Sequence, residues 1–171
     1  MITEVQRQAW ERYKTDHSEF LAVADDMQDC LVKVVSSAGI DAEVSARAKD
    51  VASFAKKMIV KAYADPWAQV TDKVAARIVV GLRAEQERVL EAIKAEPALE
   101  IVGDIDDKAA ALRSDQFRYA SIHFQLAVPG RENGRHPDLE CEVQLRTRAQ
   151  HIWAVSEHKM VYKGVIATPD E

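Results

Sequence analysis

The spacing of hydrophobic and polar residues divides the first part of the chain into helices and one strand. Thr3 begins a capping box, and the breaker-free run behind it predicts one long or two short helices as far as Gly39. From Ile40 to Lys49 apolar and polar residues alternate, which predicts a strand with one polar face. Helical spacing returns over residues 50–64 and ends before a proline.

Strands and helices alternate in the second part of the chain. Residues 74–82 are apolar on both faces except for Arg77, which predicts a strand in the middle of a sheet with both faces covered. The elements expected after it are a helix over 84–96, a short strand over 99–102, a polar connection over 103–116, strands over 119–128 and 139–146 joined as a hairpin, and a helix over 147–163.

This order of elements predicts the α/β or α+β class, with a mixed sheet flanked by helices. A length of 171 residues fits one domain. We expect residues 1–38 to form its N-terminal helices and residues 40–163 its core.

Composition and charge narrow the class of protein further. The chain has 23 basic and 28 acidic residues, a net charge of -5, which argues against binding nucleic acid by bulk attraction. Two cysteines are too few for a disulfide framework and favour a reduced, cytoplasmic setting. No apolar run approaches a membrane span and the N-terminus has no secretory signal pattern, so we expect a cytoplasmic protein without membrane contact.

Positive charge is concentrated in one segment of this acidic chain. Residues 47–61 contain Arg47, Lys49, Lys56, Lys57 and Lys61 against a single Asp50, and no glycine-rich phosphate loop occurs anywhere. Arg47 and Lys49 share a strand face, and Ser53 lies one helical turn before Lys57. These four side chains are candidate polyphosphate ligands. The alternative is a solvated basic helix face.

Carboxylates and a polar stripe follow in other predicted strands. Asp72 precedes the strand over 74–82, and Glu142 lies mid-strand beside Gln144, an arrangement that suits Mg²⁺. The alternative is a loop aspartate and a surface glutamate. The stripe consists of Tyr119, Ser121 and His123, and offers a ring for base stacking and two hydrogen-bonding groups. A solvent-facing sheet surface is its alternative.

These residues resemble, in order and spacing, four motifs of the RelA/SpoT synthetase domain. The matching positions are Arg47, Lys49, Ser53 and Lys57; Asp72 and Arg77; Tyr119, Ser121 and His123; and Glu142, Gln144, Arg146 and Thr147, followed by Trp153, Glu157, His158, Tyr162 and Lys163. The single-domain length, with no room for a hydrolase or regulatory region, is similar to that of small stand-alone alarmone synthetases.

The resemblance implies a nucleotidyltransferase-like mixed sheet of about five strands. It also implies Mg²⁺-dependent transfer of pyrophosphate from ATP to the 3′-hydroxyl of GDP or GTP, which makes (p)ppGpp and releases AMP. By position it implies ATP binding by Arg47, Lys49, Ser53 and Lys57; acceptor binding by Tyr119, Ser121 and His123; magnesium binding by Asp72 and Glu142; catalysis by Glu142 and Gln144; and support by Arg77 and Arg146. It leaves open a homo-oligomer.

One segment departs from the family pattern on the acceptor side. Residues 114–118 replace the usual Pro-Lys-x-Asn-Gly before Tyr119, and the arrangement of Asp115, Phe117 and Tyr119 looks closer to toxin-like members. Some of those modify the tRNA 3′ end or adenosine nucleotides. The alternatives are therefore a toxic synthetase of that kind, with an antitoxin as a partner, and a catalytically inactive nucleotide- or partner-binding module.

Overall fold

The N-terminal segment of the computed structural model is a single helix, α1 (Glu4–Ser37), rather than two. Its capping box is formed, since the backbone amide of Gln6 donates to the Thr3 hydroxyl and the Thr3 amide donates to the Gln6 side chain. The structure describes residues 2–108, 121–128 and 139–164, with side chains as far as residue 156.

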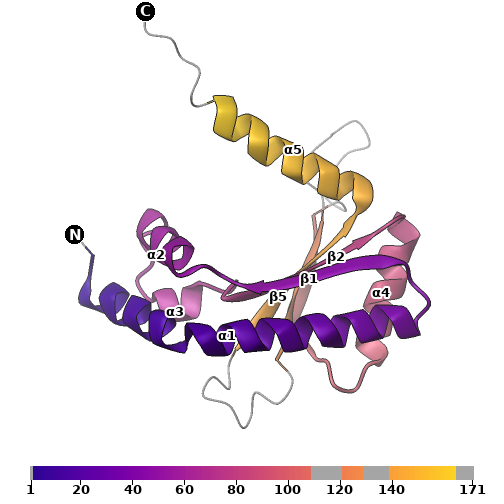
Figure 1. Cartoon of the computed structure of the whole chain (residues 1–171), viewed down its shortest axis with the longest axis horizontal. Coiled ribbons are helices and arrows are strands. Elements are labelled where there is room, and N and C mark those ends of the chain that lie inside the picture. The colour runs from indigo at the N-terminus through magenta and orange to yellow at the C-terminus, as the bar shows by residue number, and fades with distance from the viewer. Residues whose placement is uncertain (1, 109–120, 129–138, 165–171) are drawn as a thin grey trace, which may run out of the picture.

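The remaining elements form a five-stranded mixed sheet flanked by helices, as predicted (Figure 1). They are β1 (Ala42–Ala48), α2 (Val51–Val60), α3 (Pro66–Gln69), β2 (Val74–Val80), α4 (Arg83–Ala95), β3 (Ile101–Asp107), β4 (Ile122–Ala127), β5 (Glu140–Thr147) and α5 (Arg148–Gly164). The strand order is β1-β2-β5-β4-β3, and only β2 and β5 pair in parallel. The antiparallel pairing of β4 and β5 confirms the predicted hairpin partners.

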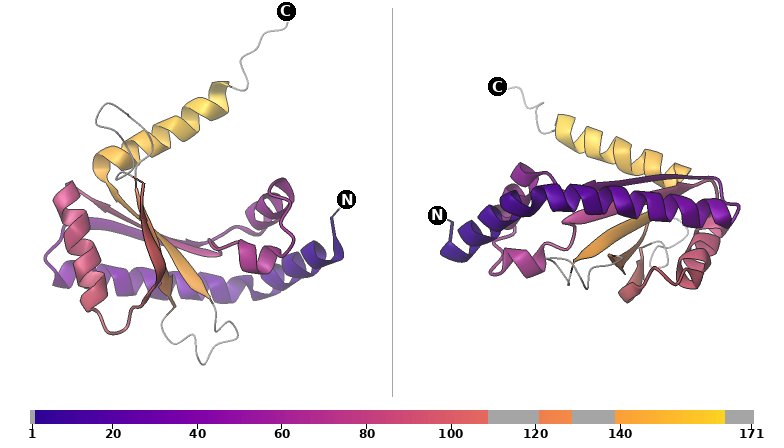
Figure 2. Two further views of the ribbon diagram at one scale, coloured as in Figure 1. Left: turned by 180° about the vertical axis from the view of Figure 1, so that it is seen from behind. Right: turned by 60° about the horizontal axis from the view of Figure 1, so that its bottom comes forward.

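The helices leave part of one sheet face open. α1 packs on β1 and β2, and α4 packs on β2 and β5, so both cover the same apolar face. α5 leaves the end of β5 on the opposite side of the sheet (Figures 1 and 2). Its main contacts there are with β5 and β2. The rest of that face carries the polar side chains of the alternating strands.

The prediction that both faces of β2 are covered is therefore wrong for its first half. Ala75 and Arg77 point to the open face and are only half-buried, whereas Val79 near the α5 end is buried. The position of β2 between β1 and β5, inside the sheet, is as predicted.

The strand predicted over residues 99–102 is longer, and the polar connection predicted from residue 103 onward begins later. β3 runs from Ile101 to Asp107, with a register shift against β4 between Val102 and Asp106. Gly103 has a φ of 71°, which lets the chain continue past this irregularity. β3 is an edge strand, so its polar side chains remain in contact with water and the hydrophobic pattern is weak.

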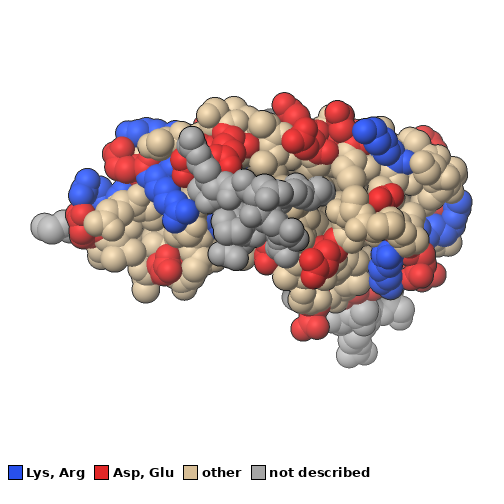
Figure 3. Space-filling model, turned by 90° about the horizontal axis from the view of Figure 1, so that it is seen from below, with Lys and Arg blue, Asp and Glu red and all other residues tan. Residues whose placement is uncertain are grey.

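Charged side chains of both signs are interspersed on the face of the molecule seen in Figure 3. The net negative charge is thus not gathered into one region there. Within residues 2–108, 121–128 and 139–164, no helix is long and apolar enough to cross a membrane.

Candidate active site

Strand register places the polar residues of four strands in two adjacent rows across the open face. One row runs from Arg47 through Ala75 and Glu142 to Gln125. The next consists of Ser45, Arg77, Gln144 and His123. Because neighbouring strands are roughly 5 Å apart, the rows bring together residues that are almost 100 positions apart in the sequence.

A cavity lies between the arginines of these rows because Ala75 has a small side chain. It has a volume of about 260 Å³ and is lined by Ser45, Ala46, Arg47, Ala75, Ala76, Arg77 and Gln144. Guanidinium groups stack on flat aromatic rings as well as binding anions. The cavity therefore has walls suited to a nucleobase, and Arg77 lines it, whereas the sequence assigned this residue only a supporting role.

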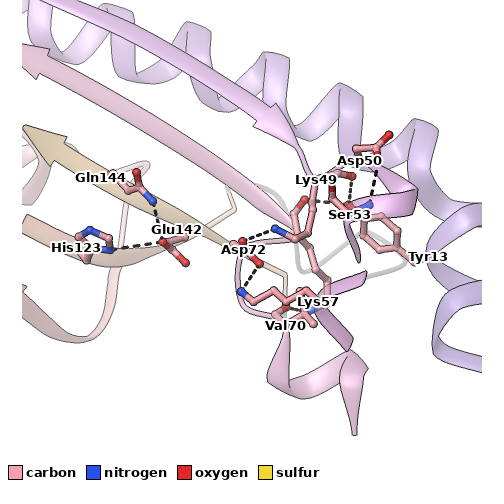
Figure 4. A network of polar contacts seen from close by, with 11 residues as sticks. Tyr13, Lys49, Asp50, Ser53, Lys57, Val70, Asp72, His123, Glu142 and Gln144 are labelled. Carbon is pink, nitrogen blue, oxygen red and sulfur yellow. Dashed lines mark hydrogen bonds and ion pairs between the residues drawn. The ribbon is translucent and has the colours of Figure 1, made fainter. Parts of the chain in front are cut away.

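Asp72 joins the basic residues at the edge of the same face (Figure 4). Lys49 donates to its Oδ2 at 2.5 Å and Lys57 to its Oδ1 at 2.9 Å. Burial raises the pKa of Asp72, but the hydrogen bonds and charges of the two lysines outweigh it, so the pKa lies below its ordinary value. Both lysines also line a cavity of about 230 Å³ with Ser53, Lys56, Val60 and Lys61.

Local structure explains why these groups converge. Asp50 caps α2 by accepting from the backbone amide of Ser53, so the helix starts directly after β1. This sets Lys57 one turn above Ser53 and facing Asp72. The backbone amide of Lys49 also donates to the carbonyl of Lys73, which ties the end of β1 to the start of β2.

Glu142 lies at the centre of the open face with polar neighbours on the same face. Gln144 donates to its Oε1 at 3.2 Å, and the His123 Nδ1 lies 3.5 Å from the same oxygen. The hydrogen bond with His123 contributes most to lowering the pKa of Glu142, and Gln144 adds to it. Burial and the negative charge of Asp72 act in the opposite direction and raise the pKa of Glu142, but they are outweighed.

Most of the remaining predicted site residues support this arrangement. Arg146 is almost fully buried and donates to Gln144 at 2.6 Å. Ser121 is fully buried and its hydroxyl lies 2.6 Å from the His123 Nε2. Tyr119, predicted to stack on the acceptor base, lies outside the described residues.

Two residues with a place at the site were not among the sequence candidates. Gln125 faces Glu142 across the strand pair, and its side-chain oxygen is buried without a hydrogen-bond partner in the part of the chain that the structure describes. The alternation that singles out Ser121 and His123 includes Gln125 as well. Tyr13 on α1 is the other, and no sequence pattern links it to the strands.

Tyr13 connects the end of β1 at Lys49 with the start of β2 at Lys73, next to Asp72. Its hydroxyl donates to the carbonyl of Lys49 at 2.6 Å and lies 3.2 Å from that of Lys73. The ring is stacked on Phe54 of α2 at 4.2 Å between centroids. Burial raises the pKa of Tyr13, so the hydroxyl stays protonated and remains a donor.

We expect Tyr13→Phe to lower the free energy of unfolding by about 0.5–1.5 kcal/mol, because it removes the hydrogen bond of a buried hydroxyl and keeps the ring stack. The Lys73 carbonyl keeps the backbone amide of Lys49 as its donor, so the loss is that of one hydrogen bond. This corresponds to a fall in Tm of about 1–6 °C for a chain of this size, measurable by thermal denaturation. Tyr63→Phe is the control, since the Tyr63 hydroxyl has no hydrogen-bond partner within the described ranges. Equal melting curves for both variants would contradict the role of Tyr13.

Stability should fall on acidification because both site carboxylates have lowered pKa values. In the unfolded chain they titrate at about pH 4. Their contribution is therefore fully present above that pH and is lost as pH falls through the lower pKa values of the folded state. We expect Tm to fall between about pH 5 and pH 3, and to fall less steeply in Asp72→Asn. If Tm fell equally steeply with pH in the wild type and in Asp72→Asn, Asp72 would not be a source of the pH dependence.

The two carboxylates were also tested for their fit to the predicted Mg²⁺. In the described residues no group of three or more His, Cys, Asp or Glu side chains could hold a metal ion. Mg²⁺ in nucleotide-binding enzymes commonly takes only one or two carboxylates, with phosphate oxygens and water completing its shell. The pair formed by Asp72 and Glu142 fits such an ion if a polyphosphate supplies the rest.

Comparison with solved structures gives the class of fold. The small alarmone synthetase 1 from Bacillus subtilis is 25% identical, with a TM-score of 0.72 over 94% of this chain and 82% of that one. Its structure bound to its product pppGpp is 24% identical, with a TM-score of 0.68 over 91% and 83% of the two chains. Its structure bound to AMPCPP is 23% identical, with a TM-score of 0.67 over 95% and 83%. The fold is that of the small alarmone synthetases.

The family follows from the sequence match. Residues 46–166 match the region found in RelA / SpoT proteins, and this span includes the end of β1, the strands β2 to β5 and every predicted site residue. The chain belongs to the RelA/SpoT family and is a pyrophosphotransferase of the small synthetase type. A comparison with curated protein sequences found no match.

Proposed function

We propose that the protein transfers the β,γ-pyrophosphate of ATP to the 3′-hydroxyl of GDP or GTP and releases AMP. The observation that carries the proposal is the position of Glu142 on the open sheet face. On one side of it lie the two cavities lined by arginine and lysine side chains, and on the other side lies His123 on β4. The small alarmone synthetase 1 from Bacillus subtilis binds AMPCPP and its product pppGpp, which agrees with such a donor and such a product.

The donor side would use both cavities. Arg47 and Arg77 would enclose the adenine, and Lys49, Ser53 and Lys57 would bind the phosphates. Asp72 and Glu142 would hold Mg²⁺, which neutralises charge on the phosphates when it is bound. Arg146 would keep Gln144 oriented through their hydrogen bond.

The acceptor side would use the other end of the rows. Glu142 accepts the proton of the attacking 3′-hydroxyl, whose oxygen forms a bond to the β-phosphorus while the bond from that phosphorus to the α,β-bridging oxygen breaks and AMP leaves. Gln144 would help to orient the hydroxyl, and His123, held by Ser121, would contact an acceptor phosphate. Tyr119 would stack on the acceptor base.

A second acceptor class is favoured by the sequence before Tyr119. Residues 114–118 lack the lysine and asparagine of the family's acceptor loop, and Asp115 and Phe117 follow the toxin-like pattern. The tRNA 3′ end or an adenosine nucleotide would then take the pyrophosphate by the same chemistry. An antitoxin or a second copy of the chain as partner belongs to this proposal as well.

The deciding experiment offers each acceptor separately. The protein is incubated with γ-labelled ATP and Mg²⁺ and with GDP, GTP, AMP, ADP, further ATP or deacylated tRNA. Labelled ppGpp or pppGpp supports the guanosine acceptor, and label only on tRNA or an adenosine nucleotide supports the second class. Label on no acceptor refutes both and leaves a catalytically inactive binding module.

A further inference from the structure

We propose that Lys49, Asp72 and Lys57 make the donor site selective for a metal-bound polyphosphate over the free metal ion or the free polyphosphate. This inference rests on the proposed donor site. Its basis is that in the ligand-free site each carboxylate oxygen of Asp72 already holds one lysine (Figure 4). The two groups expected to bind phosphate thus occupy the group expected to bind metal.

A divalent cation by itself meets a site that is already neutralised. To reach Asp72 it must displace both ammonium groups, whose side chains are only 12% and 29% exposed. The displaced lysines would remain beside the incoming cation, with little water around them and no carboxylate to pair with. Repulsion between like charges in this half-buried setting weakens binding of the bare ion.

A polyphosphate by itself meets the opposite difficulty. Its oxygens draw Lys49 and Lys57 away from Asp72 and leave that carboxylate, 21% exposed, without a cation. Asp72 also acts on Glu142 electrostatically, so the metal-free phosphate enters beside two negative side chains. A half-buried carboxylate that loses its partners destabilises the complex.

A metal-bound polyphosphate removes both difficulties at once. The cation takes the place of the lysines at Asp72, and the phosphates take the place of Asp72 at the lysines, so that no charge is left unpaired. The phosphate oxygens also complete the coordination shell that the two carboxylates leave unfinished. The metal and the phosphate must then favour each other's binding by the same factor.

The test compares binding of Mn²⁺ alone, followed by electron paramagnetic resonance of the free ion, in the wild type and in Lys57→Met. Removing a lysine from Asp72 should tighten Mn²⁺ binding by about tenfold. The same substitution should weaken binding of AMPCPP measured in EDTA. Lys57→Gln repeats the comparison if the methionine variant does not fold.

Lys56→Met is the matched control, because Lys56 lines the same cavity one residue earlier and is not a hydrogen-bond partner of Asp72 in the described part of the chain. It should leave Mn²⁺ affinity within about twofold of the wild type. Unchanged or weaker Mn²⁺ binding in Lys57→Met would overturn the inference, as would an equal gain in Lys56→Met. If the wild type fails to bind AMPCPP with Mn²⁺ present, the proposed function fails instead, and the comparison of Mn²⁺ alone still decides the inference.

Discussion

Glu142→Gln will lower the rate of pyrophosphate transfer by about 10²–10⁴-fold, which is the usual contribution of a positioned base. The amide has nearly the volume of the carboxylate and can still accept from Gln144, so packing on the open face is preserved. It cannot take the proton of the acceptor hydroxyl, and it is a weak ligand for Mg²⁺. Initial rates with the acceptor identified by the labelling experiment measure the effect.

Glu140→Gln provides the control for this prediction. Glu140 lies two residues earlier on β5, is half-buried and points to the same side of the strand. Its substitution removes the same charge from the same strand and should keep the rate within about twofold of the wild type. Full activity in Glu142→Gln would rule out the assigned base, and equal losses in both variants would point to a general charge effect.

The elements that carry the site could be predicted because their patterns are local. Alternation over β1 and over β5 separates polar from apolar faces within a few residues, and this sets Arg47 and Glu142 on the polar side. The cap of α2 is likewise local, since Asp50 and Ser53 are three residues apart. The register between strands is not local, and it is the register that creates the two rows.

Tertiary contacts decide the features that sequence reasoning missed. The resemblance implies only a supporting role for Arg77, and the hydrophobic pattern predicts that β2 is covered on both faces. In the structure α5 covers the far end of β2, and Arg77 lines a cavity on the open face. Tyr13 reaches Lys49 across 36 residues of sequence, and no periodicity can indicate such a contact. The strand predicted over residues 99–102 ends too early, because an edge strand with a bulge needs little hydrophobic patterning and β3 continues to Asp107.

Asp72→Asn should lower transfer by about 10³-fold, because it removes one of two carboxylates from an already incomplete metal site. It also deprives Lys49 and Lys57 of their shared partner, so we expect the free energy of unfolding to fall by about 1–3 kcal/mol. The protein should nevertheless remain folded at the assay temperature, as far-ultraviolet circular dichroism and a thermal melt will show.

Binding without metal separates the catalytic loss from the structural one. In Asp72→Asn the two lysines are available to phosphate and no carboxylate opposes it, so AMPCPP in EDTA should bind at least as tightly as to the wild type. Asp41→Asn is the control, since Asp41 also pairs with a basic side chain, Arg148, but on the exposed surface where an ion pair contributes little. It should preserve both activity and Tm. Loss of metal-free AMPCPP binding in Asp72→Asn would mean that Asp72 holds the lysines in place for phosphate rather than competing with it.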